Sequence, residues 1–151
     1  ANKLAPIGKF YHPNKVIGGQ RTIDADYIYM RVEEMYLLNA EACAKTGDEA
    51  GARKSLKAIM ALRVPDASYI DALTGKALLD EIYLQTRIEL WGEGHRFLDL
   101  KRTNAALNRN GTNAIASVAL LFDVAPGDVR WEFLIPRREI NANPAIVQNP
   151  L

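Results

Sequence analysis

A short segment of this 151-residue chain, residues 87–102, gathers side chains that could do chemistry. The candidates are Glu89, Glu93, His95 and Asp99. Residues of these types can hold a transition metal, or can act as a general acid and base beside a histidine. Glu89 and Glu93 lie four apart, so they share one face of a helix, whereas His95 lies beyond a glycine.

Basic side chains surround these acids. They are Arg87, Arg96, Lys101 and Arg102. Asp99 and Arg102 are three apart, where they can pair on a helix. Because structural ion-pair networks also collect charges in this way, ion pairs and contacts to helix ends account for the segment better than a metal does. We expect no specific transition-metal binding here, and we predict no cofactor.

Bulky apolar residues in the same segment indicate a buried or half-buried helical elbow. They are Trp91, Phe97, Leu98 and Leu100. Gly92 and Gly94 permit a close approach or a break in the helix. We therefore predict a structural role for the motif residues. These are Arg87, Glu89, Trp91, Glu93, Arg96, Asp99 and Arg102.

Other catalytic patterns are absent from the sequence. Ser55, Ser68 and Ser117 have no Gly-x-Ser-x-Gly setting, and the second histidine, His12, lies in a predicted loop. The sequence has no phosphate-binding loop and no dinucleotide fingerprint. These observations argue against catalysis within residues 1–151.

The elements that must position these residues are mainly helices. Residues 27–46 carry a broad apolar stripe, Gly47 is a natural residue just past a helix end, and Asp48 is a predicted cap of a second helix that runs to about Arg63. The stripe consists of Met30, Met35, Leu37, Leu38, Ala42 and Cys43. Together these features predict a helical hairpin.

Small residues in this hairpin stand where a tetratricopeptide repeat needs them. With Gly47 as the turn glycine, Ala40 lies seven before it and Ala52 five after it, followed by Leu56 and Ile59. A generic helical hairpin is the alternative. A repeat unit cannot bury its apolar face alone, so the pattern also predicts neighbouring helices.

The rest of the chain is predicted to contain fewer regular elements. A third helix begins near residues 75–78 and a shorter one covers about residues 95–104, followed by an irregular stretch over 105–129. Residues 129–135 alternate apolar and charged side chains and predict one short strand, and an extended surface tail follows Pro136. The predicted fold class is mainly α, with tetratricopeptide-like hairpins, an irregular C-terminal third and little strand.

Composition excludes several classes of partner. Nineteen basic and eighteen acidic residues leave a net charge of +1, so nothing indicates nucleic acid or an anionic membrane surface. The single cysteine, Cys43, excludes an internal disulfide within these residues and is predicted to be a buried, inert thiol. No apolar run approaches membrane-spanning length.

Three segments, in this order, resemble the signature of the SusD/RagB family, surface lipoproteins with which Bacteroidetes capture glycans beside a TonB-dependent transporter. The segments are Met30 to Ala42, which ends in Ala-Glu-Ala; Arg87 to Arg102; and Phe133-Leu134-Ile135-Pro136 with Glu139-Ile140, Asn143-Pro144 and Gln148-Asn149-Pro150. The resemblance covers roughly residues 9–151. Family members are several times longer, so the resemblance implies that residues 1–151 are a single C-terminal domain of a longer chain.

The resemblance also implies a function. It implies a non-enzymatic protein at the outer-membrane surface that binds an oligosaccharide or another nutrient and delivers it to a SusC-like transporter. The signal peptide and lipid anchor would belong to residues outside this segment. The alternative is a helical-repeat module that binds proteins and has no fixed small-molecule ligand, for which the hairpin alone would suffice.

Tyr69 is the best-placed residue for a sugar contact within the segment. It lies between two predicted helices, in residues 66–71, where polar side chains flank its ring. Aromatic faces stack on sugar rings only when they are displayed in a groove or on a platform. The competing interpretation is that Tyr69 covers the helix ends. The resemblance places most ligand contacts outside residues 1–151.

Overall fold

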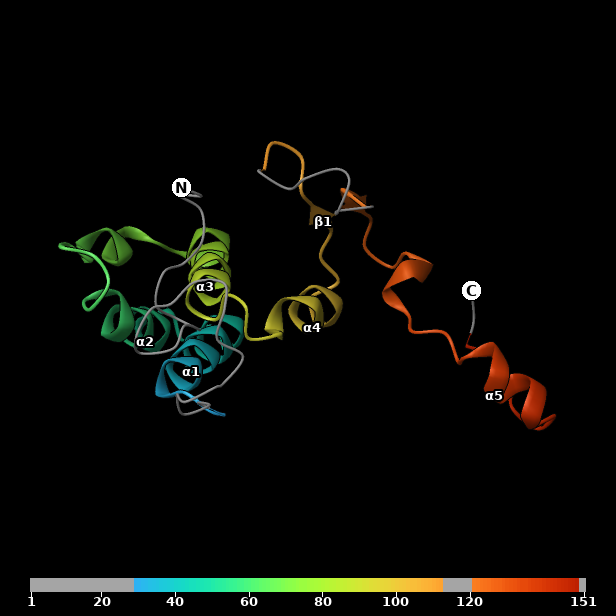
Figure 1. Ribbon diagram of the computed structural model, residues 1–151. Coiled ribbons are helices and arrows are strands. Elements are labelled where there is room, and N and C mark those ends of the chain that lie inside the picture. The colour runs from blue at the N-terminus through green and yellow to red at the C-terminus, as the bar shows by residue number, and fades with distance from the viewer. Residues whose placement is uncertain (1–28, 113–120, 150–151) are drawn as a thin grey trace, which may run out of the picture. The chain divides into compact units, whose positions relative to one another are not determined.

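A computed structural model describes residues 29–112 and 121–149 (Figure 1). The described residues contain five α-helices, two short 3-10 helices and two strands of two residues each, which confirms the predicted fold class. Contacts divide the chain into two compact units, residues 1–82 and 83–151. Each unit is described by itself below. No described helix is long and apolar enough to be a candidate for a membrane span.

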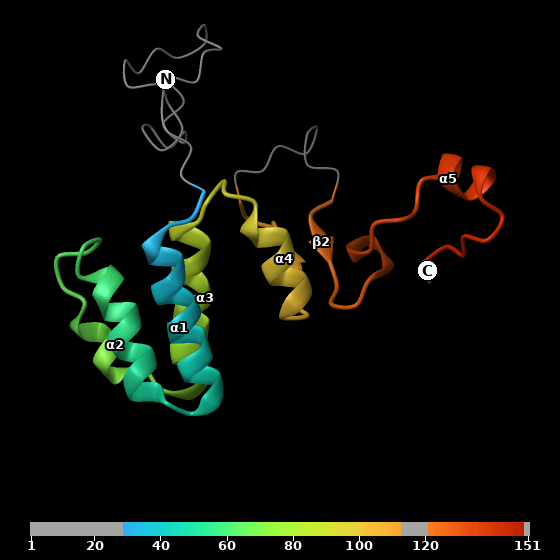
Figure 2. The ribbon, with the colours of Figure 1, turned by 90° about the horizontal axis from the view of Figure 1, so that it is seen from below.

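The predicted hairpin is present in the first unit. Helix α1 (Val32–Thr46) and helix α2 (Glu49–Met60) lie side by side, joined at Gly47, which has a left-handed φ of 87° (Figure 2). The backbone N–H of Asp48 donates to the Cys43 carbonyl at 2.9 Å, and the Asp48 carboxylate accepts from the Gly51 N–H at 2.9 Å. Gly47 thus caps the C-terminus of α1, and the Asp48 side chain caps the N-terminus of α2, as the sequence predicts.

The hairpin closes over the predicted small residues. Ala40 and Ala52 are fully buried, and Leu56 and Ile59 lie in the same apolar cluster. The remaining core side chains come from α1, α2, the 3-10 helix η1 (Ser68–Ala72) and helix α3 (Gly75–Glu89). They are Leu37, Met60, Ile70, Leu78 and Ile82. The alanines lack bulk, and this allows the helices to approach closely.

The predicted apolar stripe of α1 is wrong in part. Met30 precedes the helix and is 66% exposed, because Arg31 has extended backbone angles (φ −118°, ψ 144°) and α1 begins after it. Met35 and Leu38 are also exposed, and the buried positions of α1 are Leu37, Ala40 and Glu41. The reason is that residues 29–82 cover one face of α1, and the predicted stripe is wider than that face.

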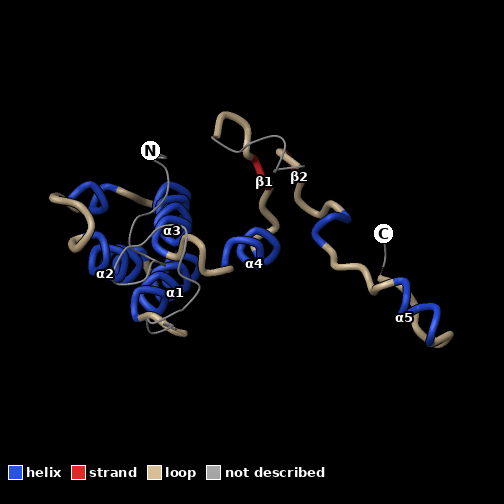
Figure 3. Tube along the Cα trace, in the orientation of Figure 1, coloured by secondary structure: helices blue, strands red, loops and turns tan. Residues whose placement is uncertain are grey.

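The second unit is smaller and less regular (Figure 3). Helix α4 (His95–Arg102) is followed by strand β1 (Leu107–Asn108), which pairs antiparallel with β2 (Asp123–Val124) so that Leu107 lies opposite Val124. Leu100, Val124 and Trp131 form its core. The apolar run that begins at residue 114 lies largely outside the described residues.

The strand predicted over residues 129–135 is wrong. Val129–Trp131 form a 3-10 helix, η2. The Asp128 carboxylate accepts from the Arg130 N–H at 2.9 Å, and the Trp131 indole donates to the Ala125 carbonyl at 2.7 Å. These two local hydrogen bonds favour a turn over an extended chain, and among the described residues no strand pairs with this segment.

The extended tail predicted after Pro136 is also wrong over its first part. Arg137–Ala142 form helix α5, which begins directly after Pro136 and has Glu139 in its first turn. Proline is compatible with a helix start, since the N–H it lacks would have no partner there. An acidic first turn is favourable as well. Beyond α5, residues 143–149 contain no regular element.

Candidate functional site

Tyr69, the predicted sugar contact, lies in η1. Its hydroxyl donates to the Glu81 carboxylate at 2.7 Å, and the residue is 41% exposed. Desolvation, followed in size by the hydrogen bond and charge of Glu81, raises the pKa of Tyr69 to about 12. The hydroxyl is thus held as a donor to α3. The ring remains partly open to solvent and is the part of the side chain that could stack on a ligand.

The loop around Tyr69 is fixed by short polar contacts. Asp66 accepts from the Ser68 N–H at 2.8 Å and from its hydroxyl at 2.9 Å, and these bonds lower the pKa of Asp66. The Lys57 ammonium donates to both oxygens of Asp71, at 2.7 and 2.9 Å. Ile70, next to Tyr69, is fully buried. Tyr69 is therefore displayed from a backbone anchored on both sides.

The elbow motif lies in the second unit, from the end of α3 into α4. Gly92 and Gly94 have left-handed φ values of 78° and 86°, so the break predicted at the glycines is present. Trp91 is 50% exposed, and Leu98 is 62% exposed. The elbow is half-buried rather than buried: Leu100 and the neighbouring Leu90 are buried, whereas Phe97 is partly buried.

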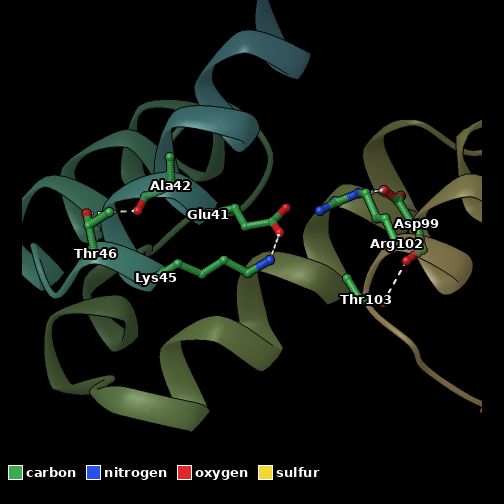
Figure 4. Close-up of polar contacts among 7 residues, drawn as sticks. All are labelled: Glu41, Ala42, Lys45, Thr46, Asp99, Arg102 and Thr103. Atoms are coloured by element: carbon green, nitrogen blue, oxygen red, sulfur yellow. Dashed lines mark hydrogen bonds and ion pairs between the residues drawn. The ribbon is translucent and has the colours of Figure 1, made fainter.

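Two charged residues of the motif, Asp99 and Arg102, form an ion pair. Arg102 donates to the Asp99 carboxylate through Nε at 2.9 Å and through a terminal nitrogen at 2.8 Å, which confirms the predicted pair (Figure 4). Thr103 donates its hydroxyl to the Asp99 carbonyl at 2.6 Å. Desolvation lowers the pKa of Arg96, the nearby Arg87 lowers it further, and Asp99 opposes the shift. The guanidinium groups of Arg87 and Arg96 are thus close enough to repel.

The acids and the histidine do not assemble into a metal centre in the described part of the chain. No group of three or more His, Cys, Asp or Glu side chains is placed there to hold an ion. Glu89, Glu93 and His95 are partly buried and make interactions of their own. The predicted structural role of these residues stays a prediction, as does the expectation that zinc does not bind.

Sequence reasoning missed an ion pair in the first unit, between the buried carboxylate of Glu41 and the exposed ammonium of Lys45. The carboxylate of Glu41 accepts from the Lys45 ammonium at 2.7 Å, and the Glu41 side chain is only 8% exposed (Figure 4). The spacing of four residues on one helix is the signal that could have revealed it. Cys43, which lies between Glu41 and Lys45 in the sequence, is partly buried against the core. This burial is the largest cause of a raised pKa for its thiol.

Two amide side chains near the C-terminus make hydrogen bonds to the backbone of residues 133–135. The Gln148 carboxamide accepts from the Ile135 N–H at 2.9 Å and donates to the Ile135 carbonyl at 3.0 Å. Asn149 donates to the Phe133 carbonyl at 2.8 Å. A glutamine carries one acceptor and two donors, so it can satisfy both backbone groups of a single residue. This explains why an amide pair follows the Phe-Leu-Ile-Pro segment.

Helices that pack as a repeat-like hairpin, followed by an ion-paired elbow and an amide-clamped tail, define a mainly helical, repeat-like class of protein. The model of the SusD family matches residues 2–151, and the chain belongs to that family. A search of curated proteins gave no significant match. Proteins of the SusD family bind ligands without catalysis, which confirms the prediction that the chain is not an enzyme.

Proposed function

We propose that the protein containing this chain binds a glycan, or another nutrient, at the surface of the bacterial outer membrane and delivers it to a SusC-like TonB-dependent transporter. The observation that carries this proposal is the SusD family match over residues 2–151. Contact with the membrane would come from a lipid anchor outside these residues. The net charge of +1 gives no reason to expect nucleic acid as a partner.

Residues 1–151 act, in this proposal, as a single C-terminal domain that supports a ligand site built mostly elsewhere in the protein. The elbow residues have structural duties, since Asp99 is already bound to Arg102 through two contacts. Tyr69 is the ligand contact proposed within the chain. Its exposed ring and its anchored backbone support that role.

The experiment compares the full-length protein with residues 1–151 on a glycan array, and assays both for released sugar products. We expect the full-length protein to bind a glycan without hydrolysing it, and the isolated segment to bind much more weakly. Hydrolysis by the pure full-length protein would refute the non-catalytic role. If residues 1–151 alone bound the glycan as tightly as the full-length protein, the main site could not lie outside them.

Tyr69→Ala and Tyr69→Phe in the full-length protein separate the ring from the hydroxyl. If the ring stacks on the ligand, Tyr69→Ala weakens glycan binding, whereas Tyr69→Phe keeps it, because the hydroxyl already donates to Glu81. Tyr83→Phe, on α3, is a matched control. If Tyr69→Ala bound the glycan with the same affinity as the natural protein, Tyr69 would not be a ligand contact.

One observation favours a second candidate, a helical-repeat module that binds another protein. The outer face of α1 exposes four large apolar side chains, Val32, Met35, Tyr36 and Leu38. Exposed apolar patches of this kind mark interaction surfaces. A full-length protein that binds no glycan on the array, but loses a protein partner when Tyr36 and Leu38 are changed to serine, would favour this function over nutrient binding.

A further inference from the structure

We infer that a cleft in the second unit, between the C-terminal end of α4 and residues 127–132, binds a small neutral molecule rich in hydroxyl groups, such as one or two sugar rings. The cleft measures about 380 Å³, at the small end of the range for ligand pockets. Its apolar lining is Leu100, Ala105, Val129 and Trp131, and its polar side chains are Lys101, Asn104, Asp128 and Glu132.

The apolar wall of the cleft is held by packing and by one hydrogen bond. Trp131 is only 8% exposed, its indole N–H is bound to the Ala125 carbonyl, and Phe97 packs against its ring at 5.8 Å between centroids. Leu100 is buried beside it in the same cluster. Val129, which is 49% exposed, offers apolar surface at the opening. A fixed wall of this kind suits the C–H face of a sugar ring.

The charged groups of the cleft are already neutralised in pairs. The Lys101 ammonium lies 2.7 Å from the Glu132 carboxylate, and both side chains are about half exposed. The Asp128 carboxylate accepts two side-chain hydrogen bonds and one backbone hydrogen bond from Arg130, which hold its pKa at about 2. An ionic ligand would have to compete with these partners.

Hydroxyl groups of a neutral ligand do not need to break these pairs. A carboxylate has about four lone-pair positions and an ammonium has three N–H donors, so Glu132, Asp128 and Lys101 each keep capacity for a hydroxyl. A sugar hydroxyl both donates and accepts, and it can bridge a carboxylate to an ammonium. The chemistry of the cleft therefore favours a neutral ligand with many hydroxyls over an acid or an amine.

Asn104 adds an uncharged donor and acceptor at the opening. It is exposed, and its carboxamide has no hydrogen-bond partner within residues 29–112 and 121–149. Its backbone is left-handed, with φ at 50°, a conformation that glycine also adopts readily. Asn104→Gly therefore removes the amide and leaves the backbone unstrained, which makes it a clean probe of the cleft.

The inference deepens the proposed function by naming a second ligand contact, and its test gives a separate readout. The full-length protein is titrated with D-glucose, D-galactose, maltose and lactose, and with D-glucuronate and D-glucosamine as charged counterparts, while the indole N–H signals of its tryptophans are followed by NMR. We expect saturable shifts of the Trp131 signal with at least one neutral sugar, and weaker responses to the charged ones.

Two variants and a control test the position of the ligand. We expect Asn104→Gly to weaken binding about three- to tenfold, through the loss of one or two hydrogen bonds, and Val129→Trp to abolish it by filling the cleft. Lys76→Met breaks a similar exposed ion pair, with Asp80 of the first unit, and leaves binding unchanged.

The outcomes distinguish this inference from the proposed function. A Trp131 signal that does not respond to any sugar, in a protein that binds glycans on the array, overturns the cleft and leaves the proposed function intact. Tighter binding of glucuronate or glucosamine, or full affinity in Val129→Trp, also overturns the inference. A specific Trp131 response in a protein that binds nothing on the array supports the cleft and counts against the proposed function.

Discussion

The two tryptophans of the chain have different environments, although both lie in segments that suggest burial. Trp91 is 50% exposed, whereas Trp131 is 8% exposed and donates its indole N–H to a backbone carbonyl. Full truncation of a buried tryptophan costs about 3–5 kcal/mol. We therefore expect Trp131→Ala to lower the free energy of unfolding by that amount and Trp91→Ala by clearly less, measured by urea titration. A larger loss of stability in Trp91→Ala than in Trp131→Ala would contradict the half-buried position of Trp91.

Glu49 links the start of α2 to the start of α3. Its carboxylate accepts from the Gly75 N–H at 2.6 Å and from Arg53 at 3.1 Å, and Arg53 also donates to the Leu73 carbonyl. The bond from Gly75 is the largest cause, and Arg53 the next, of a pKa for Glu49 below its ordinary value of 4.5. One acidic side chain thus orders a helix start 26 residues away.

We expect Glu49→Gln to lower the melting temperature at pH 7. A carboxylate whose pKa is lowered by folding stabilises the folded state above its unfolded pKa, and this contribution is lost as the pH falls through the folded value. The difference in melting temperature between the natural protein and the variant should therefore shrink below about pH 4.5. Thermal melts from pH 7 to pH 3 measure it. A difference that is constant with pH would exclude the charge as its cause.

Asp80→Asn is the matched control for Glu49→Gln. It removes a carboxylate from an exposed ion pair with Lys76 on α3. Exposed pairs of this kind contribute about 0–1 kcal/mol, so we expect a melting temperature close to that of the natural protein.

At the scale of the elements, the hairpin depends on small side chains between α1 and α2. Ala52 is fully buried, and a larger side chain there would separate the helices. We expect Ala52→Leu to destabilise the protein by about 1–3 kcal/mol through overpacking. Ala58, on the exposed side of α2, gives the control, because Ala58→Leu should change stability by less than about 0.5 kcal/mol. Equal effects of the two substitutions in urea titrations would contradict the repeat-like packing.

The C-terminal elements differ from their prediction because local hydrogen bonds determine them. Alternating residues predicted a strand over 129–135, but Asp128 and Trp131 bond within their own turn. Further along, the backbone N–H and C=O of Ile135 do make hydrogen bonds. Their partner is the side chain of Gln148 and not the backbone of a second strand. Alternation alone does not make a strand, because a strand also needs a neighbouring strand with which its backbone can pair.

At the scale of the whole molecule, the two compact units share a helix. Residues 75–82 of α3 belong to the first unit, and residues 83–89 belong to the second. The sequence predicts one domain, and a single domain unfolds in one cooperative transition. Both tryptophans, at positions 91 and 131, lie in the second unit, so their fluorescence reports on that unit alone.

Leu56→Ala tests this cooperativity from the other unit. Leu56 is fully buried in the first unit, and its truncation should cost about 2–5 kcal/mol. If the chain is one domain, the urea midpoint seen by tryptophan fluorescence falls accordingly, whereas Leu62→Ala, at a residue 76% exposed, leaves it unchanged. An unchanged midpoint in Leu56→Ala would show that the units unfold independently.

Local patterns in the sequence were sufficient for helices α1 to α4 and for the family, but not for α5. Gly47 and Asp48 mark a helix end and a helix start through their own backbone and side-chain chemistry, and both act as predicted. Ala40 and Ala52 are buried at the positions that a repeat requires. The pair between Asp99 and Arg102 follows from helical spacing alone. The helix end, the helix start and the ion pair depend on residues near one another in the chain, so the sequence alone determines them.

Only the tertiary structure decided which apolar residues are covered and which distant groups meet. Met35 and Leu38 are as apolar as Leu37, but the neighbouring helices cover one face of α1 and leave the others in solvent. The contacts between Glu49 and Gly75, and between Lys101 and Glu132, join residues 26 and 31 positions apart. No short-range pattern encodes such pairs, because burial and long-range hydrogen bonds depend on how the elements pack together.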